Sequence, residues 1–156
     1  MLNVASNLVE LLKARGLTCA TAESCTGGGV GSAITAVPGS SAVFAGGVIS
    51  YSNEVKRDVL GVSAQTLEAH GAVSAETAAQ MAAGARRLLK TDLAVSLTGI
   101  AGPDGGSAEK PVGLVWFGLA TAQGVRTEKA IFRGDREGIR RNAIVHALGM
   151  LTVAAS

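Results

Sequence analysis

Apolar residues recur at helical spacing in several segments of the chain. The first segment predicts an amphipathic helix over about 5–15, which ends before Gly16. An alanine-rich segment follows Ser74, a residue type that favours a helix start, and its small side chains suit close packing against a sheet. The last helix is expected to begin after Asp135 and to reach about Val153.

Runs of β-branched and small apolar residues predict strands between these helices. The expected strands are 17–23, 43–52, 92–99, 113–121 and 125–132. The third run is apolar throughout, which favours burial on both faces, and the last two runs are joined by a short turn as a hairpin. A helix over 27–36 would connect the first two strands.

The order of these elements predicts the fold class. Alternating strands and helices followed by a hairpin indicate an α/β fold with a mixed, mostly parallel sheet and helices on both of its faces. A chain of 156 residues is long enough for a sizeable core, so we expect a single domain over 1–156.

Composition narrows the classes of function. Hydrophobic residues make up 47% of the chain and the net charge is only +2, which gives no argument for nucleic acid or a membrane surface as a partner. The two cysteines form no disulfide framework, and no spacing of metal ligands is visible, so we expect neither a metal nor a cofactor. The start does not resemble a signal peptide and no long apolar run follows, which favours a cytoplasmic protein.

Polar turns follow three of the predicted strands. They cover Glu23–Gly28, Ser50–Lys56 and Thr98–Lys110. In open α/β sheets, ligands bind beyond the carboxyl ends of the strands, so these turns are expected to meet at one site.

The first turn, "ESCTGG", offers a nucleophile beside backbone amides. Ser24 would lie at the strand end, and the amides of Thr26, Gly27 and Gly28 would point outward at the positive end of a helix, where they can receive an oxyanion or a phosphate. Glu23 is the carboxylate of the same turn. The alternative is that Ser24 or Thr26 simply caps the helix.

The nucleophile and its base remain open from spacing alone. Cys25 competes with Ser24, because a helix N-terminus lowers the pKa of a thiol. His146 is expected in the core and His70 as a helix terminator, so neither histidine favours a triad. Lys56 is a candidate base only if burial or a neighbouring cation lowers its pKa from about 10.4; otherwise it is a surface lysine.

The third turn is longer than a connection between strands requires. Loops of this length are more often functional than idle, although a solvent-exposed loop is the alternative. Its glycines allow the backbone to close over a ligand, and its polar side chains could reach one; the residues concerned are Thr98, Gly99, Gly102, Gly105 and Lys110. An arginine cluster near the C-terminus could hold an acidic small molecule or form a solvated helix face; it comprises Arg133, Arg136, Arg140 and Arg141.

Six segments in order resemble the C-terminal domain of the CinA (competence-damage-inducible protein) family. They are "TAESCTGG", "YSNEVK", "HGAVS", "SLTGIAGPDGG", "EKPVG" and "FRGDREGIRR". The resemblance implies a three-layer α/β/α fold and hydrolysis of the carboxamide of nicotinamide mononucleotide, releasing ammonia, in pyridine nucleotide salvage. The family's serine and lysine correspond to Ser24 and Lys56. Many relatives carry a bulky residue where this chain has Gly29.

The mechanism that we expect also gives roles to other residues. Tyr51 would relay a proton to the departing ammonia. Residues expected to contact the substrate are Glu23, Thr26, Gly27, Gly28, Thr98, Gly99, Gly102, Gly105 and Lys110, with Arg133 or Arg136 on its phosphate. Two alternatives are a nucleotide-binding module without turnover and a phosphate-ester hydrolase. The alanine-rich helix is compatible with a homo-oligomer or with burial in the monomer.

Overall fold

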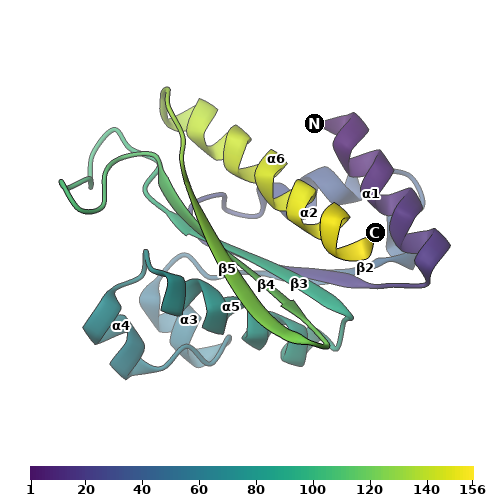
Figure 1. Cartoon of the computed structure of the whole chain (residues 1–156), viewed down its shortest axis with the longest axis horizontal. Helices are drawn as coiled ribbons and strands as arrows, with labels where there is room; N and C mark the ends of the chain where they lie inside the picture. Colours follow the sequence, from purple (N-terminus) through teal and green to yellow (C-terminus); the bar gives the residue numbers. More distant parts are fainter.

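The computed structural model describes residues 1–156, in which a five-stranded sheet lies between two groups of helices (Figure 1). The strands are β1 (Cys19–Glu23), β2 (Phe44–Ile49), β3 (Leu93–Gly99), β4 (Leu114–Thr121) and β5 (Gly124–Ile131). The helices are α1 (Leu2–Arg15), α2 (Gly29–Thr35), α3 (Asn53–Asp58), α4 (Ala64–His70), α5 (Ala75–Leu89) and α6 (Arg136–Ala155), with one further helical turn at Ser40–Ala42. The predicted α/β fold class is confirmed.

The sheet is mixed, in the strand order β2-β1-β3-β4-β5. Strand β1 pairs in parallel with both β2 and β3, whereas the β4–β5 hairpin is added antiparallel to β3. Because β1, β2 and β3 run in the same direction, their carboxyl ends lie at the same edge of the sheet. The turns that follow Glu23, Ile49 and Gly99 therefore come together there.

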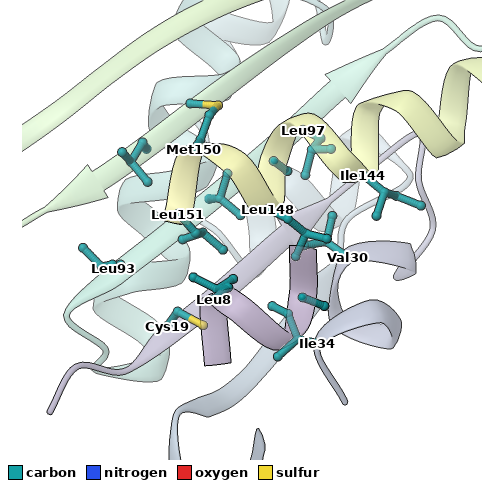
Figure 2. Close-up of a cluster of buried hydrophobic side chains, with 14 of the residues drawn as sticks. Leu8, Cys19, Val30, Ile34, Leu93, Leu97, Ile144, Leu148, Met150 and Leu151 are labelled. Atoms are coloured by element: carbon teal, nitrogen blue, oxygen red, sulfur yellow. The ribbon is translucent and has the colours of Figure 1, made fainter. Parts of the chain in front are cut away.

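Helices α1, α2 and α6 cover one face of the sheet, and α3, α4 and α5 lie on the other (Figure 1). The larger core, of 23 buried residues, lies beneath α1, α2 and α6, where Leu8, Ile34 and Leu148 meet the strands (Figure 2). The smaller core has 9 buried residues and is rich in alanine, including Ala82 on α5 and Ala20 on β1. Small side chains let α5 lie close to the sheet.

Two glycines show how closely α5 packs against the segment that precedes it and against the sheet. A Cβ atom on Gly84 of α5 would overlap with the carbonyl oxygen of Leu60. A Cβ atom on Gly118 of β4 would overlap with the carbonyl oxygen of Ala78 on α5. The alanine-rich pattern of α5 is therefore explained by packing within the monomer. None of the helices combines the length and the apolar character that crossing a bilayer requires.

Candidate active site

Side chains from the ends of the parallel strands meet in one cavity. Ser24 follows β1, Lys56 lies on α3 just after β2, and Thr98 lies near the end of β3. The cavity has a volume of about 220 Å³. Its walls are formed by Ser24, Cys25, Tyr51, Asn53, Lys56, Ala72, Val73, Thr98, Gly99, Ala101 and Arg136.

Lys56 is buried beside Ser24. Its side chain comes from α3, which begins where the Ser52 hydroxyl accepts a hydrogen bond from the Val55 amide. Lys56 is only 1% exposed, and its Nζ lies 3.1 Å from Ser24 Oγ and 3.1 Å from the carbonyl oxygen of Tyr51. No carboxylate forms an ion pair with it. Burial therefore lowers the pKa of Lys56, which favours the neutral amine that a base requires.

Ser24 is held in place by its own backbone. Its amide donates to the carbonyl of Leu97 on β3 at 3.0 Å, and its carbonyl accepts from the Gly27 amide at 3.0 Å. Ser24 is 8% exposed, so its hydroxyl is accessible mainly through the cavity. A hydroxyl fixed next to a buried amine is the geometry of a serine nucleophile with a lysine base.

Cys25, the rival nucleophile, is a buried thiol. Burial raises the pKa of Cys25 to about 11, outweighing the smaller lowering effects of a backbone hydrogen bond and of the nearby Arg140 and Lys56. The expectation that the helix N-terminus would lower the pKa of this thiol is wrong, because desolvation dominates. The thiolate is therefore scarce near neutral pH, and the geometry favours Ser24.

Glu23 is directed into the protein, away from the cavity. Its carboxylate is 1% exposed and accepts hydrogen bonds from the Thr26 hydroxyl at 2.6 Å and from the amides of Val30 at 2.8 Å and Gly31 at 3.0 Å. Helix α2 needs this carboxylate because its N-cap residue is Gly28, which has no side chain to cap the helix. The side chains of Glu23 and Thr26 thus hold the turn together, which does not favour the expected contact of either side chain with substrate.

The free amides of the turn differ from those expected. The Gly27 amide donates to the Ser24 carbonyl, so it is not available to a ligand. The amides of Cys25 and Thr26 donate to no other residue of the chain. Gly27 and Gly28 adopt left-handed φ values of 59° and 99°, which turn the chain into α2. Cys25 lines the cavity, whereas Thr26, Gly27 and Gly28 do not. Of the oxyanion donors predicted at Thr26, Gly27 and Gly28, only the Gly27 amide is occupied, and the Cys25 amide beside Ser24 is a further free donor.

Tyr51 and Arg136 lie at the cavity together. Tyr51 is 62% exposed, and its hydroxyl lies 3.4 Å from Arg136 Nη2. The guanidinium of Arg136 also donates to the Gly102 carbonyl at 2.8 Å, which joins α6 to the loop after β3. Tyr51 contacts Lys56 through its carbonyl, whereas its hydroxyl contacts neither Lys56 nor Ser24. This arrangement does not favour the proton-relay role expected for Tyr51.

Several residues expected at the site do not line the cavity. Lys110 Nζ donates to the His70 carbonyl at 2.7 Å and so fastens the loop to α4. Gly102 packs against Val112, and Gly105 is exposed on the loop. Arg133 is exposed and has no hydrogen bond or ion pair. Of the predicted loop residues, Thr98 and Gly99 do line the cavity, and the Thr98 hydroxyl donates to the Ala72 carbonyl at 2.8 Å.

Sequence reasoning missed other residues of the site. Asn53, Ala72, Val73 and Ala101 line the cavity but carry no reactive group that would have singled them out. The sequence indicates Arg140 only as one member of a cluster of arginines. Ala72 and Val73 belong to the "HGAVS" segment, and its place among the six segments could have indicated that it forms a wall of the cavity.

The two histidines lie away from the cavity, as expected. His70 is the last residue of α4, with Nδ1 3.6 Å from Glu76 Oε2. His146 of α6 packs on Phe117 with ring centroids 4.3 Å apart. No group of three or more His, Cys, Asp or Glu side chains is arranged as metal ligands would be.

Gly29 does not shape the cavity. A Cβ atom at this position would collide with Ile144 Cδ1, so the side chain of Ile144 on α6 occupies the space that a larger residue would need. A larger residue at this position would therefore change the packing of α2 against α6.

Comparison with known proteins gives consistent matches over the whole chain. The family model described as the CinA C-terminal domain matches residues 1–154. The nicotinamide-nucleotide amidohydrolase PncC of Escherichia coli K12 is 51% identical over 152 residues, which are 97% of this chain and 92% of that protein. The crystal structure of the competence/damage inducible protein CihA from Agrobacterium tumefaciens has a TM-score of 0.95 at 44% identity and covers 99% of this chain and 94% of its own.

Longer relatives match over part of their length only. A putative competence-damage inducible protein of Caldanaerobacter subterraneus is 55% identical over 144 residues, which are 92% of this chain but 35% of that protein. The chain thus spans about a third of the length of that relative.

Proposed function

The chain belongs to the CinA C-terminal domain family, and we propose that it hydrolyses nicotinamide mononucleotide to nicotinate mononucleotide and ammonia. The 51% identity to Escherichia coli PncC over 97% of the chain supports this activity. The observation that carries the proposed chemistry is the 3.1 Å distance between Lys56 Nζ and Ser24 Oγ inside a cavity. A buried amine next to a hydroxyl can activate it without a histidine.

In the first step, Ser24 Oγ attacks the carbon of the carboxamide. As the new C–O bond forms, the hydroxyl proton passes to the neutral amine of Lys56, and the carbonyl π electrons move onto the oxygen. The low pKa of Lys56 makes the neutral amine available for this transfer. The product of this step is a tetrahedral oxyanion next to a lysine ammonium.

The oxyanion requires hydrogen-bond donors that are already in place. The amides of Cys25 and Thr26 are adjacent to Ser24 and donate to no other residue, so we assign them this role. Removing one such donor from an enzyme typically lowers kcat by about 100-fold or more.

The intermediate then breaks down in two stages. The C–N bond breaks, and the departing ammonia takes the proton from the Lys56 ammonium, which leaves an ester on Ser24. Water attacks this ester, with Lys56 again accepting a proton, and the C–O bond to Ser24 breaks. Lys56 returns its proton to the serine oxygen, so that one water is consumed and one ammonia released.

The size of the cavity suggests how the substrate is arranged. A volume of about 220 Å³ is below the usual range for pockets that enclose a drug-sized ligand. We infer that the carboxamide ring occupies the cavity beside Thr98 and Gly99, with the ribose phosphate at its mouth. There Arg136, a planar cation suited to phosphate, is the residue we assign to it, next to the exposed Tyr51.

The test measures ammonia release from nicotinamide mononucleotide in the presence of a metal chelator. We expect Ser24→Ala and Lys56→Met to lower kcat by about 100-fold or more, because each removes a group that forms or transfers a bond. Cys25→Ala should retain most of the activity, since its thiol stays protonated. Circular dichroism of each variant establishes that it is folded.

Other outcomes would identify the alternatives. Loss of activity in Cys25→Ala alone, with full activity in Ser24→Ala, would assign the chemistry to the thiol. Tight binding of the nucleotide without ammonia release would indicate a binding module. Phosphate release that requires a divalent ion would indicate a phosphate-ester hydrolase.

A further inference from the structure

The turn after β1 has its carbonyl groups bound within the protein. The Glu23 carbonyl accepts from the Ser50 amide at 2.8 Å, and the Ser24 carbonyl accepts from the Gly27 amide at 3.0 Å. The Cys25 carbonyl accepts from Arg140 Nε at 3.1 Å. The amides of Cys25, Thr26 and Gly28, in contrast, donate to no other residue, and those of Cys25 and Thr26 are the nearest to Ser24 in the chain.

The orientation of each free amide is set by the carbonyl of the same peptide unit. In a trans peptide the C=O and N–H groups point in opposite directions. The Cys25 amide belongs to the peptide of the Ser24 carbonyl, which the Gly27 amide holds. The Thr26 amide belongs to the peptide of the Cys25 carbonyl, whose hydrogen-bond donor is Arg140. The Cys25 amide is thus fixed by the backbone and the Thr26 amide by a side chain.

Arg140 reaches this turn from the other end of the chain. It lies on α6, does not line the cavity, and forms no ion pair with a carboxylate. Its Nη2 donates to the Thr26 carbonyl at 3.1 Å, so the planar guanidinium binds two successive carbonyls of the turn. Arg140 is partly buried, and its partners in the turn are neutral carbonyls and not a carboxylate. This indicates that the arginine serves to hold the turn.

We propose that Arg140 is a positioning residue for the reaction: it holds the Cys25 and Thr26 carbonyls so that the Thr26 amide remains directed at the oxyanion. Its unpaired positive charge lies behind the peptide and strengthens that amide as a donor, because a bound carbonyl polarises the N–H of the same unit. Arg140 differs in this from Arg136, which lines the cavity and can touch the substrate itself.

The kinetic test compares Arg140→Gln with Arg141→Gln. Arg141 is the adjacent residue on α6 and pairs with the exposed Glu137 at 2.8 Å, so it provides a matched control. We expect Arg140→Gln to lower kcat about 100-fold, with KM changed by less than about threefold, because the lost contact acts in the transition state. Arg141→Gln should behave as the wild-type protein does.

A substrate without phosphate separates positioning from phosphate binding. We expect Arg140→Gln to lose the same factor of kcat on nicotinamide riboside as on nicotinamide mononucleotide. A defect that appears in KM, and only with the phosphate-bearing substrate, would overturn the proposal, because Arg140 would then bind the substrate.

A second readout does not depend on the proposed amidohydrolase activity. A fluorophosphonate labels a reactive serine: the Ser24 oxygen bonds to phosphorus, fluoride leaves, the proton passes to Lys56, and the phosphoryl oxygen occupies the oxyanion position. The rate of labelling, followed by mass spectrometry, should fall by a factor similar to that in kcat for Arg140→Gln but not for Arg141→Gln. Wild-type labelling without ammonia release would reject the proposed function alone.

Arg140→Lys tests the geometry in a variant that keeps the charge. A lysine lacks the planar fork that binds two carbonyls, so we expect a smaller loss of kcat and of labelling rate, on the order of 10-fold. Its thermal midpoint should remain close to that of the wild-type protein. Full activity in folded Arg140→Lys or Arg140→Gln would overturn the proposal, as would a wild-type protein whose Ser24 resists labelling.

Discussion

Lys56 is buried without a carboxylate partner, and this single residue links stability to the proposed chemistry. Burial disfavours the ammonium form, so the pKa of Lys56 is lowered from its ordinary value. The amine can then accept a proton from Ser24 at a pH where most lysines are charged. The same desolvation opposes folding whenever the amine is protonated.

The first prediction concerns activity and pH. If neutral Lys56 is the base, kcat/KM for the amide substrate should rise with pH, and the midpoint of this rise should lie below the ordinary lysine value of about 10.4. Initial rates measured across the pH range would show it. A profile with no such rise at any pH at which the protein stays folded, or with its midpoint at or above the ordinary lysine value, would contradict this role of Lys56.

The second prediction concerns stability and pH. Between the lowered pKa of Lys56 and the ordinary value of about 10.4, the unfolded chain binds more protons than the folded one, so the free energy of unfolding increases with pH. In Lys56→Met this increase should be smaller, and at neutral pH the variant should be at least as stable as the wild-type protein. Urea unfolding at several pH values measures both. A variant clearly less stable at neutral pH would contradict this account.

Some residues of the site were predictable and others were not. Ser24 and Lys56 could be placed together because each follows a strand that ends at the same edge of the sheet. Glu23 was assigned to the substrate because a carboxylate near a turn looks available; the clue to its actual role was Gly28, an N-cap residue without a side chain. Arg140 and Cys25 are 115 positions apart in the sequence. The spacing of residues within α6 therefore could not predict their contact.

At the scale of elements, a glycine in α5 and a glycine in α6 differ in the space around them. A Cβ atom on Gly84 of α5 would collide with the Leu60 carbonyl, whereas one on Gly149 of α6 would meet no atom within 4 Å. We expect Gly84→Ala to reduce the free energy of unfolding by about 1–3 kcal/mol through overpacking. Gly149→Ala should increase it by up to about 1 kcal/mol, because alanine favours the helix.

Thermal or urea unfolding of both variants measures the difference. The same substitution, glycine to alanine, should therefore lower the free energy of unfolding in α5 and raise it in α6. If Gly84→Ala is neutral or stabilising, α5 does not lie as close to the preceding segment as described.

The elements themselves were largely predictable from sequence. Each expected helix and strand is present with slightly shifted ends, because apolar spacing follows the faces that are buried. Strand β2 contains Gly47 because β1 lies close to it: a Cβ atom on Gly47 would overlap with Thr21 Oγ1. The strand order could not be predicted, since it depends on which strands pair and not on their own patterns.

At the scale of the whole molecule, the larger core couples α6 to the sheet. Leu148 of α6 is fully buried within it, among residues from α1, α2 and the strands. Leu148→Ala should lower the free energy of unfolding by about 2–5 kcal/mol, because it leaves a cavity. Activity and far-ultraviolet circular dichroism should be lost at the same temperature, since Arg136 and Arg140 are carried by this helix. Loss of activity well before unfolding would show that α6 detaches separately.

The contact between Arg140 and the Ser24 turn also bears on when the protein becomes competent during synthesis. The ribosome synthesises the turn after β1 before α6, and the guanidinium that binds the turn follows more than a hundred residues later. A nascent chain that already exposes Ser24 and Lys56 therefore still lacks both arginines of the site. The oxyanion donor that Arg140 is proposed to hold is therefore complete only after α6 has been synthesised and has packed against the turn.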